Sequence, residues 1–390
     1  MRGREAERHA VSELLRQARC GTGGVVLVEG EPGAGKSRLL RDCAGQAAGD
    51  GFSLITDATG RAAGAIPFFW SRQSPGEPAA GPAGEASGDD SPVALVSWIT
   101  RLRDHLEQRS AQVPVLVCLD DMQWAPAVTL AALRVLPREL KRHPVAWLLA
   151  RSDTHRSEPE HLFDVLERDG AGRLRLPPIT REETEALLAD TFGVPPHPGL
   201  RTLAADAGGN LWLLSELIAG LLDEDLVRVT GGRAVVTSGR LPGRMRGAAR
   251  RRLGDVTEPA RRLLTTAAVL GPSFRLEDAA EMLGTTPAAL LPAVEETMAV
   301  GIITATDIAF SFRQQLLRRA VRDLVPPPRR RALHRQYGLM LLGRGDSASL
   351  AAGHLTLAAT SSDAASLADL DTAVSRTLRS APRPAAALAS

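Results

Sequence analysis

A glycine-rich segment near the N-terminus has the residue types and spacing that most clearly indicate chemistry. The run Gly30-Glu31-Pro32-Gly33-Ala34-Gly35-Lys36-Ser37 matches the pattern G-x-x-x-x-G-K-[ST]. Glycines allow the backbone to wrap phosphate groups so that its N–H groups point at them, and a helix beginning at Ser37 adds the positive end of its dipole. The sequence therefore predicts a P-loop, with Lys36 on the β- and γ-phosphates of ATP and the Ser37 hydroxyl on Mg²⁺.

A glycine-rich turn between a strand and a helix is the alternative interpretation of the same residues. The chain is rich in glycine, but its only lysines are Lys36 and Lys141, so a chance match with the lysine in place is rare. We therefore predict that the whole loop and the start of the following helix bind the nucleotide: Gly30, Glu31, Pro32, Gly33, Ala34, Gly35, Lys36, Ser37 and Arg38.

Two adjacent acids form a second candidate set. Asp120 and Asp121 end an apolar run that begins at Val115, which is the form of a Walker B strand whose terminal carboxylate holds Mg²⁺ directly or through water. We predict Asp120 as the Mg²⁺ partner together with Ser37, and Asp121 as the residue that polarises the attacking water. The alternative is a buried strand that ends in a solvated acidic turn.

Several arginines are further candidates for phosphate contacts. Arg151 ends the apolar run 145–150, and ligands of α/β sheets bind at the carboxyl ends of strands. We predict that Arg151 is catalytic together with Lys36 and Asp121, and that it acts as a γ-phosphate sensor. The alternative is a surface arginine at the end of a strand. The runs 250–252 and 329–331 are all arginine and could contact phosphate or acidic partners, but solvated helix faces are the favoured interpretation.

The elements that must position these residues alternate between helix and strand. The pattern predicts a P-loop NTPase domain of the α/β class over residues 1–153, with a parallel sheet and helices on both faces. Residues 74–92, rich in Pro, Gly, Ala and Ser, are predicted to be a flexible insertion. The predicted helices span 4–18, 37–48 and 93–109, and the predicted strands span 24–29, 52–56, 113–119 and 145–150.

Helical patterns dominate the remainder of the chain. We predict a helical lid over 154–240, a winged-helix-like domain over 241–345 and a helical tail over 346–390, for which a truncated helical repeat is one interpretation. The predicted helices are 181–192, 199–207, 211–222 and 258–270. Two strand pairs are predicted as well, 226–229 with 234–237 and 302–304 with 308–312, of which the second resembles the wing of a winged helix.

Composition limits the function classes. The chain has 390 residues, 44% of them hydrophobic and 24% charged, which is typical of a folded protein with more than one domain. A net charge of +2 with interleaved arginines and acids indicates no nucleic-acid partner. The cysteines Cys20, Cys43 and Cys118 lack metal-ligand spacing and are predicted to be reduced thiols. No apolar leader and no apolar run of about 18 residues is present, so the sequence predicts a cytoplasmic protein without a membrane partner.

Several motifs in order resemble those of AAA-like STAND ATPases, in particular the ATPase portion of the large ATP-binding LuxR-type transcriptional regulators of actinobacteria. The resemblance covers most of the chain, and Arg151 falls where that family has its sensor arginine. The matching segments are Gly3-Arg4-Glu5 with Glu7, the P-loop 30–37, Leu119-Asp120-Asp121-Met122-Gln123-Trp124-Ala125, Ala207-Gly208-Gly209-Asn210, Ala268-Val269-Leu270-Gly271 and the segment 310–316.

The resemblance implies a signalling ATPase in which ATP binding and slow hydrolysis switch a multidomain protein between two states. Three positions depart from the family pattern: Leu211 replaces a lid proline, Pro126 a common aspartate and Gln314 a winged-helix histidine. Such regulators continue into helical repeats and end in a DNA-reading helix-turn-helix. Neither is complete here, so direct sequence-specific DNA binding is not expected, and a protein partner or self-association is.

Three functions are therefore open. The favoured one is an ATP-dependent regulatory switch that hydrolyses ATP slowly and lacks its own C-terminal helix-turn-helix. The second is a truncated or degenerate module that binds nucleotide without hydrolysis, as the three departures allow. A P-loop kinase or transferase ranks last, because the sequence shows no second constellation of catalytic residues for an acceptor substrate.

Overall fold

The structure is a computed structural model that describes residues 4–58, 92–153, 158–345, 347–359 and 375. It divides into two compact units, Met1–Glu183 and Thr184–Ser390. Nearly all of the predicted insertion 74–92 lies outside the described residues.

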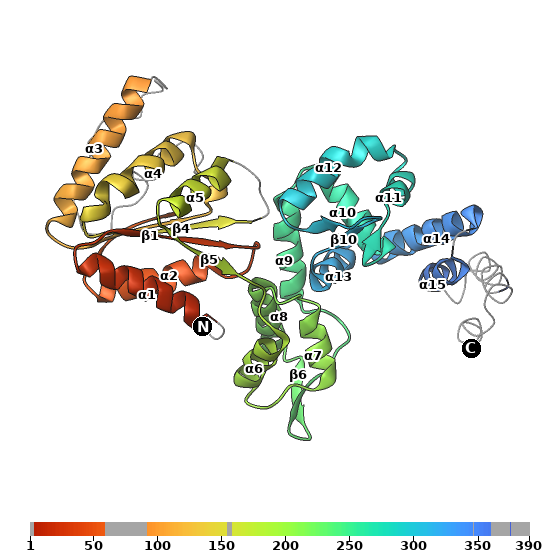
Figure 1. Cartoon of the computed structure of the whole chain (residues 1–390). Helices are drawn as coiled ribbons and strands as arrows, with labels where there is room; N and C mark the ends of the chain where they lie inside the picture. The colour runs from red at the N-terminus through yellow and green to blue at the C-terminus, as the bar shows by residue number, and fades with distance from the viewer. Residues whose placement is uncertain (1–3, 59–91, 154–157, 346, 360–374, 376–390) are drawn as a thin grey trace. The chain divides into compact units, whose positions relative to one another are not determined.

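A parallel sheet of five strands forms the centre of the first unit (Figure 1), in the order β2-β3-β4-β1-β5. The near-continuous apolar runs of β3 and β4 explain their central positions, because only a strand buried on both faces takes apolar side chains at successive positions. The strands are β1 Gly24–Gly30, β2 Ser53–Ala58, β3 Val115–Asp120, β4 Val145–Ser152 and β5 Gly172–Leu176.

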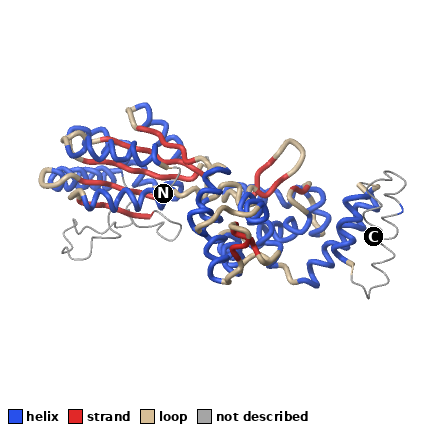
Figure 2. Tube along the Cα trace, turned by 90° about the horizontal axis from the view of Figure 1, so that it is seen from below, coloured by secondary structure: helices blue, strands red, loops and turns tan. Residues whose placement is uncertain are grey.

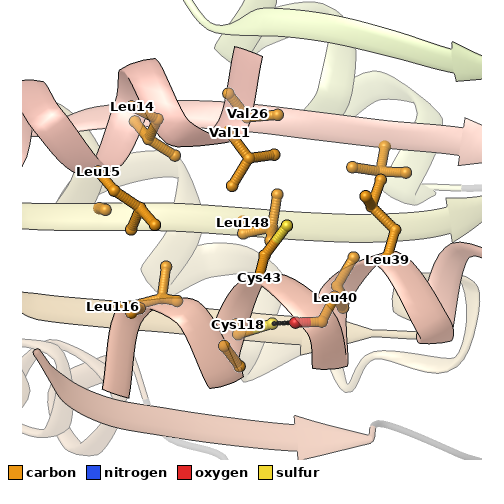
Figure 3. Close-up of a cluster of buried hydrophobic side chains, with 14 of the residues drawn as sticks. Val11, Leu14, Leu15, Val26, Leu39, Leu40, Cys43, Leu116, Cys118 and Leu148 are labelled. Carbon is orange, nitrogen blue, oxygen red and sulfur yellow. Dashed lines mark hydrogen bonds between the residues drawn. The ribbon is translucent and has the colours of Figure 1, made fainter. Parts of the chain in front are cut away.

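Helices cover both faces of this sheet (Figure 1). On one face α1 (Glu5–Arg19) and α2 (Lys36–Gly49) bury a core with the alternate side chains of β1, β3 and β4, shown in Figure 3. On the other, α3 (Pro92–Ser110), α4 (Ala127–Glu139) and α5 (Glu158–Arg168) bury a second core around Trp147. The predicted α/β class, with a parallel P-loop NTPase sheet between two helical layers, is confirmed.

The sheet extends beyond the boundary that the sequence suggested. β5 pairs with β1 from Val26↔Gly172 to Gly30↔Leu176, so the α/β unit continues past residue 153. The pattern of the sequence did not predict β5, α4 or α5. Strand β5 is short and alternates arginine with leucine, a pattern that differs from the apolar runs of the central strands.

The second unit is mainly helical, with two small antiparallel sheets. Both predicted strand pairs are confirmed, as β6 with β7 and as β9 with β10, and Figure 2 shows that helices, in blue, make up most of this part of the chain. The winged-helix assignment stays a prediction. The helices are α6 Arg181–Phe192, α7 Pro198–Ala205, α8 Leu211–Asp223, α9 Gly243–Gly254, α10 Glu258–Leu270, α11 Leu276–Leu283, α12 Pro287–Ala299, α13 Gln315–Leu324, α14 Pro327–Arg344 and α15 Ala348–Ala358; the strands are β6 Val227–Thr230, β7 Arg233–Val236, β8 Ser273–Phe274, β9 Ile303–Ala305 and β10 Phe310–Phe312.

The three cysteines are free thiols. Burial raises the pKa of Cys43 to about 11 and that of Cys118 to about 12, so both stay protonated and inert inside the first core. Among the described residues, no helix has the length and apolar character needed to span a membrane.

Candidate nucleotide-binding site

The predicted P-loop connects the carboxyl end of β1 to the first residue of α2. Gly33 and Gly35 have φ angles of 87° and 99°, in the left-handed region that glycine adopts without strain. Gly30 is required for a different reason, because a Cβ atom there would lie 2.9 Å from the carbonyl oxygen of Leu176 in β5. Together the glycines allow a tight loop at the carboxyl end of β1, directly before the N-terminus of α2.

Lys36 lies inside this loop and not on the surface. Its side chain is buried, and its Nζ donates hydrogen bonds to the carbonyl oxygens of Gly30, at 2.8 Å, and Glu31, at 3.0 Å. A buried ammonium group is stabilised by such acceptors. The loop therefore carries one positive charge at its centre.

Ser37 and Asp120 lie together, as the sequence predicted for an Mg²⁺ site. Burial raises the pKa of Asp120, and a hydrogen bond with the Ser37 side chain partly opposes this rise. The backbone N–H of Asp121 also donates to Asp120 Oδ1 at 2.8 Å. A hydroxyl and a carboxylate oxygen thus lie side by side between α2 and the end of β3.

Asp121 is held in place by Gln123, which the sequence analysis left out of the site. The backbone of Asp121 is left-handed, with a φ of 53°. The Gln123 amide donates to Asp121 Oδ1 at 2.9 Å, and its oxygen accepts from the backbone N–H of Ser152 at 2.9 Å. Gln123 therefore ties the acidic turn after β3 to the carboxyl end of β4, which suits a residue that orients Asp121.

Arg151 lies at the carboxyl end of β4 but pairs with a buried carboxylate. Its Nε is 2.6 Å and its Nη2 2.5 Å from Oε1 of Glu29, which stands opposite it on β1. Its guanidinium also lies over the Phe163 ring, 5.1 Å from the centroid, on the face covered by α3, α4 and α5. The sensor role of Arg151 stays a prediction.

A second arginine completes this buried ion-pair network. Arg173 on β5 donates from Nε to Glu29 Oε2 and from Nη2 to Glu29 Oε1, both at 2.8 Å. Burial opposes the ionisation of Glu29, but the hydrogen bonds and charges of Arg173 and Arg151 outweigh it and leave its pKa below the usual range. Sequence reasoning missed Glu29 and Arg173, whose pairing follows only from the strand order β4-β1-β5.

Arg4, part of the N-terminal motif, contacts the P-loop. Its side chain is buried, and Nη2 donates to the carbonyl oxygen of Pro177 at 2.5 Å and, at 3.4 Å, to that of Ala34 within the loop. Glu7 accepts from Nη1 at 3.1 Å. Arg4 therefore links the start of α1, the P-loop and the end of β5.

In the second unit, two motif segments that the resemblance singled out are neighbours. The backbone N–H of Leu316 donates to the carbonyl oxygen of Asp206 at 2.7 Å, and a Cβ on Gly208 would contact the buried side chain of Gln314 at 3.7 Å. Asn210 caps α8 by accepting from the N–H of Leu213 at 3.1 Å, so α8 begins without a proline at Leu211.

The site suits a nucleotide with Mg²⁺. Among the described residues, no group of three or more His, Cys, Asp or Glu side chains could hold a metal ion. Mg²⁺ in phosphoryl-transfer sites requires less, because one or two carboxylates and the phosphates themselves supply most of its ligands. Ser37 and Asp120 meet that requirement, and the loop glycines and Lys36 meet that of the phosphates.

Comparisons with known proteins agree with this assignment. Residues 1–148 match a family model described as AAA ATPase domain, so the chain contains an AAA-type ATPase domain, which is a nucleotide-binding domain. A search of curated proteins found no match.

Solved structures of P-loop ATPases are similar in fold. A Walker-type ATPase of Pyrococcus abyssi is 15% identical with a TM-score of 0.53, covering 83% of this chain and 96% of that one. Cdc6p of Pyrobaculum aerophilum is 14% identical with a TM-score of 0.41, covering 83% and 95%. A STAND protein of Pyrococcus horikoshii with a tetratricopeptide repeat sensor is 13% identical with a TM-score of 0.34, covering 96% and 52%. At such identities the likeness concerns the fold alone.

Proposed function

We propose that this chain is a signalling ATPase that binds ATP with Mg²⁺ and acts as a nucleotide-dependent regulatory switch with slow hydrolysis. One observation supports the proposal best: Lys36 is buried at the centre of the glycine loop while Ser37 and Asp120 share a hydrogen bond beside it. The AAA ATPase match over residues 1–148 supports the same class. The LuxR-type resemblance supplies the regulatory part.

Each site residue then has a defined task. The loop N–H groups and Lys36 bind the phosphates, and Ser37 and Asp120 hold Mg²⁺, which neutralises phosphate charge when bound. Asp121, oriented by Gln123, is the candidate to polarise water. Arg151 is the candidate γ-phosphate sensor, through the guanidinium N–H groups that Glu29 does not engage.

Nucleotide binding regulates the protein only if the two states of the switch differ in nucleotide affinity. The proximity of the Asp206–Asn210 and Gln314–Leu316 segments supports a coupled pair of elements within the second unit. A protein partner, or a second copy of the chain, would then bind differently to the two states. The alternative function is a nucleotide-binding module without hydrolysis, as the residues at Pro126, Leu211 and Gln314 allow.

The test is Mg²⁺-dependent binding of fluorescent ATP and ADP to the purified chain, with phosphate release measured in the same samples. Lys36→Ala is the P-loop variant and Lys141→Ala, at an exposed lysine, is its matched control. We expect Lys36→Ala to lose binding and phosphate release while Lys141→Ala keeps both. Tight binding without release by the native chain supports the module, and absence of binding by the folded native chain refutes both functions.

A further inference from the structure

An arginine-lined cleft lies within the second unit, and none of the residues that line it has been given a role so far. It has a volume of about 820 Å³ and lies where α9, α13 and α14 meet the segment that precedes α9. Five arginines line this arginine cleft, together with two carboxylates and an apolar patch. The arginines are Arg240, Arg246, Arg322, Arg330 and Arg331.

The two carboxylates in the wall do not balance these charges. Glu224 Oε1 accepts a hydrogen bond from the backbone N–H of Gly243 at 2.5 Å, so this carboxylate caps the N-terminus of α9. Asp323 is shared between Arg322, at 3.0 Å, and Arg330, at 3.4 Å.

Three guanidinium groups remain without a carboxylate. Arg240, Arg246 and Arg331 are exposed, and within the described part of the chain none of their guanidinium groups has a hydrogen bond or ion pair. Five arginines against two carboxylates leave a local excess of positive charge, which is unfavourable unless an anion offsets it.

The N-terminus of α14 adds to this positive field, whereas that of α9 already has the Glu224 carboxylate beside it. Neither α9 nor α14 has an acidic residue in its first turn, where acids are favourable. Arg246 lies near the start of α9, and Arg330 and Arg331 near the start of α14. Placing cations at the positive ends of helices costs stability, and a bound anion would remove that cost.

The positive charge of the cleft also affects a buried histidine in its wall, His334. His334 on α14 lines the cleft, and its pKa is lowered to about 4 by burial first, then by the His354 ring and the charges of Arg330 and Arg322. A phosphate group that binds those arginines would offset part of their charge. The pKa of His334 would then rise, which gives a readout that is independent of affinity.

We propose that the arginine cleft binds a small polyanion, a molecule that carries two or more phosphate groups attached to an apolar body. Arginine is suited to phosphate, since its planar guanidinium makes paired, charge-assisted hydrogen bonds. The apolar body is accommodated by Leu226, Leu241 and Leu357 in the wall. The concave shape and the volume suit a small molecule, for which pockets of roughly 300–1,000 Å³ are usual, better than an extended polymer.

The chain offers a matched pair of double variants. R246A/R331A removes one arginine of the cleft from each of α9 and α14. R250A/R329A removes an exposed arginine from the same two helices, within two to four positions of the first pair, and neither of these residues lines the cleft. Both double variants change the net charge equally.

Binding is measured by calorimetry with inorganic tripolyphosphate as the probe, in the Lys36→Ala chain so that the P-loop contributes least. We expect one saturable site, weakened about 10- to 100-fold by R246A/R331A and less than about 2-fold by R250A/R329A, because two charge-assisted hydrogen bonds are lost only in the first. NMR titration of the His334 ring should show a higher pKa with tripolyphosphate bound, in R250A/R329A but not in R246A/R331A.

Two outcomes would overturn the proposal. Equal weakening by both double variants would show a diffuse charge effect and no site. Binding of a DNA duplex of about 20 base pairs that depends on Arg246 and Arg331, with no tripolyphosphate binding, would assign the cleft to nucleic acid instead. Equal melting temperatures of the two double variants establish that both are folded.

Discussion

Replacing Glu29 with glutamine tests the buried ion-pair network at the carboxyl end of the sheet. The Glu29 side chain is 4% exposed and the Arg151 side chain 5%, so the charge that Glu29→Gln removes has little water to replace it. Removing one partner of such a buried pair costs about 3–5 kcal/mol, because the other charge stays buried without compensation. Glutamine keeps one acceptor oxygen, and we therefore expect the lower end, about 3 kcal/mol.

Hydrogen exchange read by mass spectrometry on peptides from β1 and β4 reports the opening free energy of the first unit alone. Arg175→Gln is the control, because Arg175 is 79% exposed and lies 3.7 Å from the same carboxylate, a geometry worth less than about 1 kcal/mol. A loss below about 1 kcal/mol for Glu29→Gln, or one equal to that of Arg175→Gln, would refute the argument that the network holds the sheet together.

The same variant has a predictable pH dependence. The pKa of Glu29 is lower in the folded protein than its ordinary value of 4.5. A carboxyl with a depressed folded-state pKa stabilises the protein fully above its unfolded-state pKa and loses that effect as the pH falls through the folded-state value. The stability difference between the native chain and Glu29→Gln should therefore be constant near neutral pH and should shrink on acidification below the ordinary carboxyl pKa.

Two further predictions concern other buried groups. Arg4→Ala removes hydrogen bonds from the Ala34 and Pro177 carbonyl groups, so we expect ATP affinity to fall about tenfold. Arg8→Ala is the control, because Arg8 is an exposed neighbour on α1 and its loss should change the affinity little. Equal affinities of the two variants would show that Arg4 does not position the P-loop. His334 has a folded-state pKa of about 4 against an ordinary 6.5, so the unfolded chain takes up a proton first as the pH falls. Denaturant unfolding should therefore show the second unit losing about 1 to 2 kcal/mol from this group between neutral pH and about pH 5. His334→Gln should remove that part of the loss and leave the part due to His354, whose pKa is also lowered by burial; an unchanged pH dependence would contradict the assignment.

The P-loop and the central strands could be predicted because their signals are local. The glycine pattern with Lys36 and the apolar runs of β3 and β4 each occupy a few consecutive residues, and the structure has all of them. α6 and α10 were predicted to the residue as well, and in α10 the local signal is clear, because its apolar residues recur at helical spacing and are buried.

The partners of Glu29 could not be predicted because they depend on the order of strands in space. Arg151 is 122 residues away and Arg173 is 144, and both reach Glu29 only because β1 lies between β4 and β5. The buried carboxylate partner of Arg151 therefore could not be predicted from any local sequence pattern. Gln123 is a similar case, because its second partner is the backbone of a different strand.

The arginine cleft shows the same limit for surface charge. The run 329–331 was predicted to be a solvated helix face, but two of its three arginines, Arg330 and Arg331, line the cleft with Arg240 and Arg246 from distant segments. A run of like charges on one helix is informative only when the neighbouring helices are known. The structure supplies those neighbours.

The scarcity of lysine gives the chain a built-in chemical probe. Lys36 and Lys141 carry the only side-chain amines, and the first is buried with its Nζ on two carbonyl oxygens while the second is exposed. An acylating reagent therefore modifies Lys141 readily and reaches Lys36 only when the loop opens. The ratio of the Lys36 adduct to the Lys141 adduct, measured on two peptides of one digest, reports how often the loop opens. Lys141 serves as the internal standard in every sample.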